Sequence, residues 1–113
     1  MGKAFVFLAA GFEEMEALGT VDVLRRAGIQ TIMVSISDDK KVIGAHHILV
    51  EADVLLSEAV LDGASALILP GGMPGATNLN ASVALKEALL QQYREGRIVA
   101  AICAAPNVLD LDC

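Results

Sequence analysis

The most reactive side chain in the sequence is that of Cys103, which directly follows the apolar run at 97–102. Pro106 suits the first turn of a helix, so Cys103 is predicted to lie where a buried strand turns into a helix. A thiol at such a turn faces unpaired backbone N–H groups, whose partial positive charge favours the nucleophilic thiolate. Free cysteines are also often small, inert and buried, so Cys103 alone leaves both interpretations open.

A second group of residues combines acids with an early glycine. Glu13, Glu14 and Glu16 follow Gly11, which ends the first apolar run. Three acids of this kind commonly form a solvated first turn of a helix, and Glu13 and Glu14 are predicted to be surface acids. Glu16 lies one turn into the helix, where a carboxyl group in apolar surroundings could carry protons near neutral pH.

Two further features could contribute hydrogen-bond donors to the same site. Gly71 and Gly72 follow the apolar run at 65–69, and glycines allow the backbone to turn its N–H groups toward an oxyanion. The same glycines could simply form a turn after Pro70. His46 and His47 lie in a predicted loop, where adjacent histidines are commonly exposed, although one of them could contact an anionic ligand.

The elements that must position these residues alternate between strand and helix. Helices are predicted at 13–27, which Gly28 ends, and at 83–95, with Asn80 or Ser82 as its cap and Gly96 at its end. A small hairpin is predicted around 42–50 and a short helix at 55–60. Buried strands are predicted at 3–9, 29–36, 65–69 and 97–102.

This order predicts an α/β fold with a flavodoxin-like parallel sheet between helices and a hairpin leaving the sheet. Ligands of such sheets bind outside the carboxyl ends of the strands. The acids after Gly11, the pair Gly71-Gly72 and Cys103 all follow strands, so they are predicted to form one site.

Composition narrows the classes of function. The 113 residues fit a single domain, 1–113, and a net charge of −6 argues against a nucleic-acid partner. The apolar runs are too short to span a bilayer. A mean hydropathy of +0.59 predicts that an oligomer interface or a further part of the fold covers apolar surface.

Cys103 and Cys113 form neither a disulfide framework nor a zinc motif, which favours a cytoplasmic protein with free thiols. No nucleotide-binding glycine motif is present.

Four segments together resemble the ThiJ/PfpI superfamily, and most closely its branch of Parkinson-associated "DJ-one" and YajL-like proteins. The resemblance implies the class I glutamine amidotransferase-like version of the flavodoxin-like fold. It also implies that the chain is truncated at its C-terminus, because family members continue with further strands and a final helix. The segments are GFEEMEA (11–17), VDVLRRAGI (21–29), LPGGMPGATNL (69–79) and GRIVAAICAAP (96–106).

The resemblance also assigns roles to residues. It implies that Cys103 is the nucleophile, that Glu16 is the acid bonded to its sulfur, and that Gly71, Gly72 and Ala104 supply oxyanion-type backbone donors. It implies a homodimer whose interface lies near the first helix and the hairpin. Three departures stand out: His46 replaces an arginine common in relatives, Ala104 replaces the histidine of peptidase-like members, and a histidine found further downstream in relatives is not in the sequence.

The function that these roles imply is that of a cysteine-dependent glyoxalase or deglycase without cofactor or metal. Its substrates would be small 2-oxoaldehydes, such as methylglyoxal converted to lactate, or their protein adducts. The alternative is a redox-sensing stress protein or chaperone that acts through oxidation of Cys103. A third possibility, thiazole biosynthesis, follows from the family name alone, and no residue supplies its chemistry.

Overall fold

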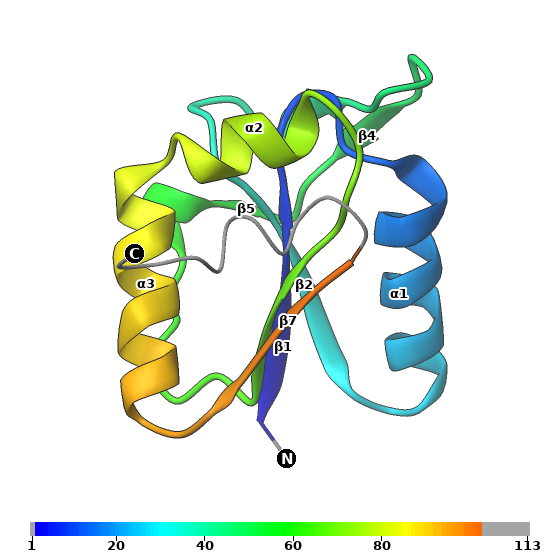
Figure 1. The fold of residues 1–113 in the computed structure, drawn as a ribbon. Helices are drawn as coiled ribbons and strands as arrows, with labels where there is room; N and C mark the ends of the chain where they lie inside the picture. Colours follow the sequence, from blue (N-terminus) through cyan, green and yellow to red (C-terminus); the bar gives the residue numbers. More distant parts are fainter. Residues whose placement is uncertain (1, 103–113) are drawn as a thin grey trace.

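The computed structural model describes residues 2–102, which form a parallel sheet with helices on both faces (Figure 1). Helix α1 covers one face, and α2 and α3 cover the other. The helices are α1 (Glu14–Arg26), α2 (Gly75–Asn80) and α3 (Val83–Arg94), with a 3₁₀ turn, η1 (Leu56–Glu58). The strands of the main sheet are β1 (Lys3–Leu8), β2 (Gln30–Ser35), β5 (Val54–Leu55), β6 (Ala66–Leu69) and β7 (Ile98–Ala101). The predicted α/β fold class is confirmed.

The order of the strands determines where a ligand site can form. The main sheet runs β5-β2-β1-β6-β7, and all its neighbouring strands are parallel. From β1 the chain moves first to one side, to β2, and later to the other side, to β6. Ligands of open α/β sheets bind at such a reversal, outside the carboxyl ends of the two strands. In this molecule the reversal lies between β1 and β6.

Strand β1 contributes to two separate hydrophobic cores because successive side chains point to opposite faces. Phe5 and Phe7 pack in the core that contains Leu85 and Leu89 of α3. Val6 and Leu8 pack in the core that contains Ala17 of α1, together with Val21. This double burial explains the uninterrupted apolar sequence of β1 and confirms the interpretation of that run as a central strand.

The hairpin and the helix ends also follow the sequence closely. Strands β3 (Lys41–Ile43) and β4 (Leu49–Glu51) pair antiparallel outside the main sheet, as predicted. Ser82 is the cap of α3, since its hydroxyl accepts the N–H of Leu85 at 3.2 Å, and Asn80 instead lies within α2. Gly28 and Gly96, which follow the two long helices, have φ values of 83° and 73°.

One prediction about a short element is wrong, and another short element was not predicted. The helix predicted at 55–60 is a strand, β5, followed by the single turn η1, and β5 extends the main sheet beyond β2. Helix α2 was not predicted from the sequence. It is six residues long and begins with glycine after Pro74, so it carries no helical repeat of apolar residues that a pattern could detect.

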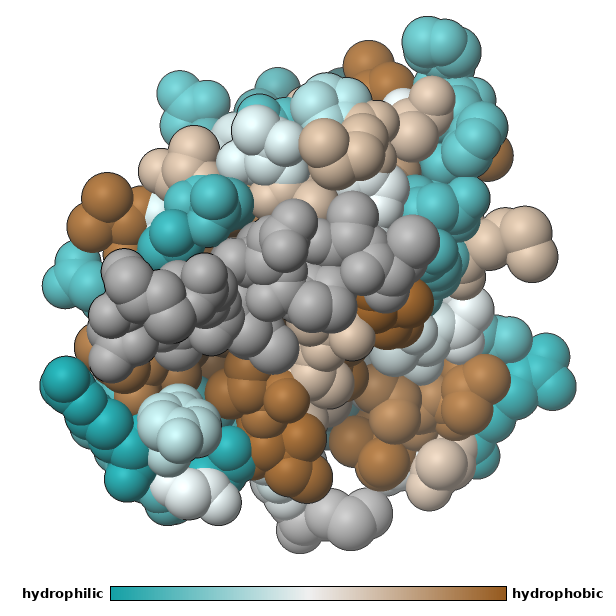
Figure 2. Space-filling view, viewed as in Figure 1, coloured by the Kyte–Doolittle hydropathy of each residue, from teal (hydrophilic) through white to brown (hydrophobic). Residues whose placement is uncertain are grey.

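Among the described residues, β7 forms an edge of the main sheet and pairs with β6 alone. Ile98 of β7 is 63% exposed. Viewed from the side of β7, apolar residues gather on the surface around this strand and α1 (Figure 2). The apolar surface agrees with the high hydropathy of the sequence. That an oligomer interface or a further part of the fold covers this surface stays a prediction.

Candidate functional site

Two loops meet at the carboxyl ends of β1 and β6, where the topology predicts a site. The N–H of Glu13 donates to the carbonyl of Gly71 at 2.9 Å, and the N–H of Gly75 donates to the carbonyl of Gly11 at 3.2 Å. Gly72 has a φ of 99°, and a Cβ atom there would lie 2.8 Å from the carbonyl oxygen of Gly11. Glycine is therefore required at position 72 for both the backbone conformation and the close approach of the two loops.

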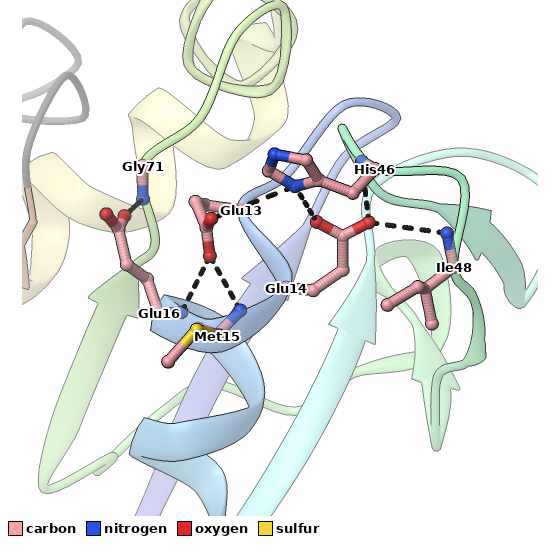
Figure 3. A network of polar contacts seen from close by, with 7 residues as sticks. All are labelled: Glu13, Glu14, Met15, Glu16, His46, Ile48 and Gly71. Atoms are coloured by element: carbon pink, nitrogen blue, oxygen red, sulfur yellow. Dashed lines mark hydrogen bonds and ion pairs between the residues drawn. The ribbon is translucent and has the colours of Figure 1, made fainter.

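Glu16 joins helix α1 to the second of these loops. Its Oε1 accepts the N–H of Gly71 at 2.9 Å (Figure 3). The structure thus brings together Glu16 and Gly71, two residues that the sequence assigns to one site. In this structure the N–H of Gly71, a predicted backbone donor, is bound to the Glu16 carboxylate. Gly72 N–H donates to no other residue in the part of the chain that the structure describes.

An open groove of about 400 Å³ runs beside Glu16 along α1. Ile102 lies at the same groove, and its N–H donates to the carbonyl of Leu69 at 3.1 Å. This hydrogen bond attaches the backbone of Ile102, the residue before Cys103, to the end of β6. Cys103 and Ala104, together with the helix predicted after them, lie outside the described residues. The groove is lined by Met15, Glu16, Gly19, Thr20, Val23, Leu24 and Ile102.

The other two acids differ: Glu13 keeps 26% of its side chain exposed, whereas Glu14 is not the solvated side chain that the sequence predicted. Glu13 is the N-cap of α1: its Oε1 accepts the N–H groups of Met15 at 2.6 Å and Glu16 at 3.2 Å. Glu14 is buried, with 5% of its surface exposed. The prediction of a surface acid is wrong for Glu14 because its partners come from the hairpin, 32 and 34 residues further along the chain.

Glu14 binds the loop between β3 and β4 through both carboxylate oxygens (Figure 3). Oε2 accepts the N–H of His46 at 2.7 Å and that of Ile48 at 3.3 Å, and Oε1 lies 2.8 Å from Nδ1 of the His46 ring. Burial favours a higher pKa for Glu14, but the hydrogen bonds from the His46 ring and from the backbone outweigh it and lower the pKa to about 2. Nothing in the sequence around Glu14 distinguishes it from Glu13.

His46 lies beside the start of α1, at the rim of the candidate site, and its ring pairs with two acids, Glu13 and Glu14. The hydrogen bond to Glu14 and the charge of Glu14 raise the pKa of His46, burial lowers it, and the charge of Glu13 raises it further. Nδ1 lies 3.8 Å from Oε2 of Glu13. The side chain is 67% exposed, so the ring is accessible to a ligand, as the sequence predicted for this loop. His47, its neighbour, has a φ of 65° and closes the turn with an N–H bond to the carbonyl of Gly44.

One cluster of side chains has the donor types of a metal site. Glu13, Glu14 and His46 each place a ligand atom within 4.8 Å of the others. The His46 ring is already paired with both acids, and Glu14 accepts three hydrogen bonds. They also lie at the N-terminus of α1, where the helix dipole disfavours a cation. The contacts within the cluster therefore account for its geometry.

In residues 2–102 there is no helix with the length and apolar character needed to cross a membrane.

Comparisons with known proteins agree with the sequence motifs. Residues 2–110 match the model of the DJ-1/PfpI family. A Parkinson disease protein 7 homolog of Danio rerio is 40% identical over 108 residues, which are 95% of this chain and 57% of that protein. A Caenorhabditis elegans protein named glutathione-independent glyoxalase DJR-1.2 is 35% identical over 97 residues, which are 86% of this chain and 51% of that protein.

Solved structures show the same likeness in three dimensions. The oxidized DJ-1 of Toxoplasma gondii superposes with a TM-score of 0.92 at 37% identity, covering 96% of this chain and 59% of the other. Drosophila melanogaster DJ-1beta gives the same TM-score, 0.92, at 37% identity, with 96% and 59% covered. The chain thus spans between half and three fifths of the length of these relatives.

Proposed function

The chain belongs to the DJ-1/PfpI family, and we propose that it acts as a cysteine-dependent, cofactor-free glyoxalase or deglycase on 2-oxoaldehydes or their protein adducts. The observation that carries the proposal is the position of Glu16. One of its carboxylate oxygens is held by the N–H of Gly71, and the side chain lines a groove that is also lined by Ile102, the residue before Cys103. A relative named as a glutathione-independent glyoxalase supports the same chemistry.

In the proposed reaction, the Cys103 thiolate attacks the aldehyde carbon of methylglyoxal and forms a hemithioacetal. Glu16 removes the proton from that carbon and returns it to the neighbouring ketone carbon, so that a thioester of a 2-hydroxy acid results. Water cleaves the thioester, which releases lactate and restores the thiol. No external oxidant is needed, because one carbon is oxidised while its neighbour is reduced.

In this proposal the backbone N–H groups have two different roles. The N–H of Gly71 orients Glu16, whereas those of Gly72 and Ala104 hold the oxyanion that forms during attack. His46 contacts a carbonyl oxygen of the ligand through Nε2, because Nδ1 is bound to Glu14.

Two cysteine variants test the proposal. Lactate formed from methylglyoxal without glutathione is measured for the chain and for Cys103→Ser and Cys113→Ser. We expect Cys113→Ser to keep the rate and Cys103→Ser to lose it. A chain without turnover, or a Cys103→Ser variant that retains it, would overturn the proposal.

A second candidate function, redox sensing through Cys103, is favoured by one finding: a similar solved structure is that of an oxidized DJ-1, from Toxoplasma gondii. In this case peroxide converts Cys103 to a sulfinate that Glu16 stabilises. Mass spectrometry after peroxide treatment would show a gain of two oxygen atoms on Cys103 without any turnover of methylglyoxal. Turnover in the absence of peroxide supports the first candidate instead.

We also propose that the protein is cytoplasmic and forms a homodimer through α1 and the hairpin. Large apolar side chains are exposed on both elements: Met15 is 82% exposed, Val23 63% and Leu49 56%. Light scattering coupled to size exclusion would measure the mass, and Met15→Lys with Val23→Lys should leave a monomer. A native chain that is already monomeric at high concentration would contradict the dimer.

A further inference from the structure

The strongest unassigned feature of the molecule is the contact between Glu14 and the loop at residues 44–48. Glu14 has 5% of its surface exposed, yet both oxygens of its carboxylate are bound to the loop. It accepts the N–H groups of His46 and Ile48 and binds the His46 ring at Nδ1. The buried carboxylate favours one conformation of the loop. In any other conformation the charge would stay buried without its hydrogen-bond partners, which is costly.

The loop itself is shaped around this carboxylate. A Cβ atom on Gly44 would lie 2.7 Å from Cγ of Glu14, so a larger residue would push the loop away. The N–H of Gly11 donates to the carbonyl of Ile43 at 2.9 Å, and the N–H of Ala45 donates to that of Phe12 at 2.8 Å. Backbone contacts therefore attach the loop to the start of α1, and Glu14 binds the part of the loop that carries His46.

The result is a defined position for the His46 ring at the rim of the candidate site. Nδ1 lies 3.8 Å from Oε2 of Glu13, and the N–H of Glu13 donates to Gly71 at 2.9 Å. Gly71 in turn binds Glu16. Three consecutive contacts thus connect His46 to the carboxylate of the proposed reaction. His46 uses its backbone N–H and Nδ1 for hydrogen bonds, and Nε2 forms none with another residue of 2–102, which leaves one ring nitrogen for a ligand.

We propose that Glu14 is a positioning residue, which orients the His46 ring so that Nε2 donates a hydrogen bond to a carbonyl oxygen of the substrate. The inference rests on the proposed function for its substrate, while the orientation of His46 by Glu14 stands independently. Glu14 itself does not touch the substrate. Its role is to fix the direction of the ring, which would otherwise rotate on an exposed loop, and to favour its protonated form.

The charges around His46 support the same role. Glu13 and Glu14, both from the start of α1, are the acids that contact the ring, and together they favour the imidazolium. Because an imidazolium carries N–H on both nitrogens, the bond from Nδ1 to Glu14 leaves Nε2 as a donor. The pairing with two acids also means that the ring adds little net positive charge to the rim. His46 therefore suits a neutral carbonyl oxygen better than a free anion.

The test compares Glu14→Gln with Glu87→Gln, a matched change at an exposed acid on α3. His46 is titrated by NMR through its ring signals, and the exchange rates of the His46 and Ile48 amides are measured. In Glu14→Gln we expect the titration midpoint of His46 to fall and the two amides to exchange about tenfold faster or more. Glu87→Gln should change neither. An unchanged His46 midpoint in folded Glu14→Gln would overturn the positioning role.

A second variant keeps the test decisive if Glu14→Gln fails to fold. His46→Gln alters an exposed side chain and should fold. We expect it to raise KM for methylglyoxal by roughly threefold to tenfold while kcat changes less. Combined with Glu14→Gln, it should add little further to KM, because both changes remove one interaction. A KM unchanged in His46→Gln would overturn the substrate contact.

The two arms separate the inference from the proposed function. If the native chain forms no lactate, the proposed function fails and the substrate contact fails with it. The titration and exchange measurements still decide whether Glu14 orients His46.

Discussion

Glu14 and Glu16 lie two residues apart in the first turn of α1, yet they hold two different loops in different ways. Glu14 is buried and accepts three hydrogen bonds from the hairpin loop. Glu16 accepts one hydrogen bond, from Gly71, and lines an open groove. A carboxylate whose oxygens are all bound to the protein can organise structure but has little capacity left for a substrate. A carboxylate held at one oxygen is oriented and still has the other oxygen to react.

The two loops also differ in what holds them. Hairpin loop 44–48 is held by the buried Glu14 carboxylate in addition to backbone contacts, whereas the loop at 71–75 is fixed largely by backbone contacts around Gly72. The first attachment should respond to pH and the second to steric changes. The following predictions test this difference.

The largest effect is expected from Glu16→Gln. The amide can still accept the N–H of Gly71, so the fold should survive, but it cannot carry a proton between the two carbons. Turnover of methylglyoxal should fall by about 10²–10⁴-fold, with an unfolding midpoint near that of the native chain. Glu87→Gln serves as the control. Full activity in Glu16→Gln would remove the distinction between the two glutamates.

A smaller loss is expected from Gly72→Ala, which probes the backbone attachment. The φ of 99° is strained for alanine, and the new Cβ would lie 2.8 Å from the carbonyl oxygen of Gly11. The free energy of unfolding should fall by about 1–3 kcal/mol or more, measured by urea denaturation. Gly19→Ala is the matched control: among residues 2–102, a Cβ at position 19 meets no atom within 4 Å outside the backbone of its own helix, and alanine should stabilise α1 by about 0.5–1 kcal/mol. Equal effects of the two substitutions would show that the loop is not tightly fixed.

The smallest effect is expected from pH, and it should concern the hairpin attachment alone. Because the pKa of His46 is raised from 6.5, its contribution to stability is complete below about 6.5 and is lost as the pH rises through the folded value. Because the pKa of Glu14 is lowered from 4.5 to about 2, its contribution is complete above about 4.5 and is lost as the pH falls toward 2. The difference in unfolding midpoint between the native chain and Glu14→Gln should therefore be greatest between about pH 4.5 and 6.5. A difference that is constant from acid to alkaline pH would contradict the ionic part of the contact.

The sequence predicts the sheet well because its long elements carry strong local signals. The apolar run of β1, and the acids and the glycine at opposite ends of the helix at 13–27, can be recognised in the sequence without any partner. Elements of two to six residues, β5 and α2, have no such signal, since neighbouring strands and loops determine them.

The site is predicted unevenly for a related reason. Glu16 and Gly71 were assigned together through the family resemblance, and the structure places them in contact. The burial of Glu14 could not be predicted, because Glu13, Glu14 and Glu16 have the same side chain and only the folded chain brings the hairpin to one of them. The proposed roles of Cys103 and Ala104 stay predictions, as these residues lie outside the described part of the chain.

Residues 11–13 have a consequence for how sequences in this fold can diverge. This short segment contacts the hairpin and the loop after β6 through main-chain atoms on both sides, from Gly11 to Ile43, from Ala45 to Phe12 and from Glu13 to Gly71. Bonds between main-chain atoms do not depend on which side chains the partners carry. At positions other than Gly44 and Gly72, both loops can therefore accumulate substitutions while the entrance they enclose keeps its shape. New substrate preferences can in this way evolve at the rim without rebuilding the scaffold beneath it.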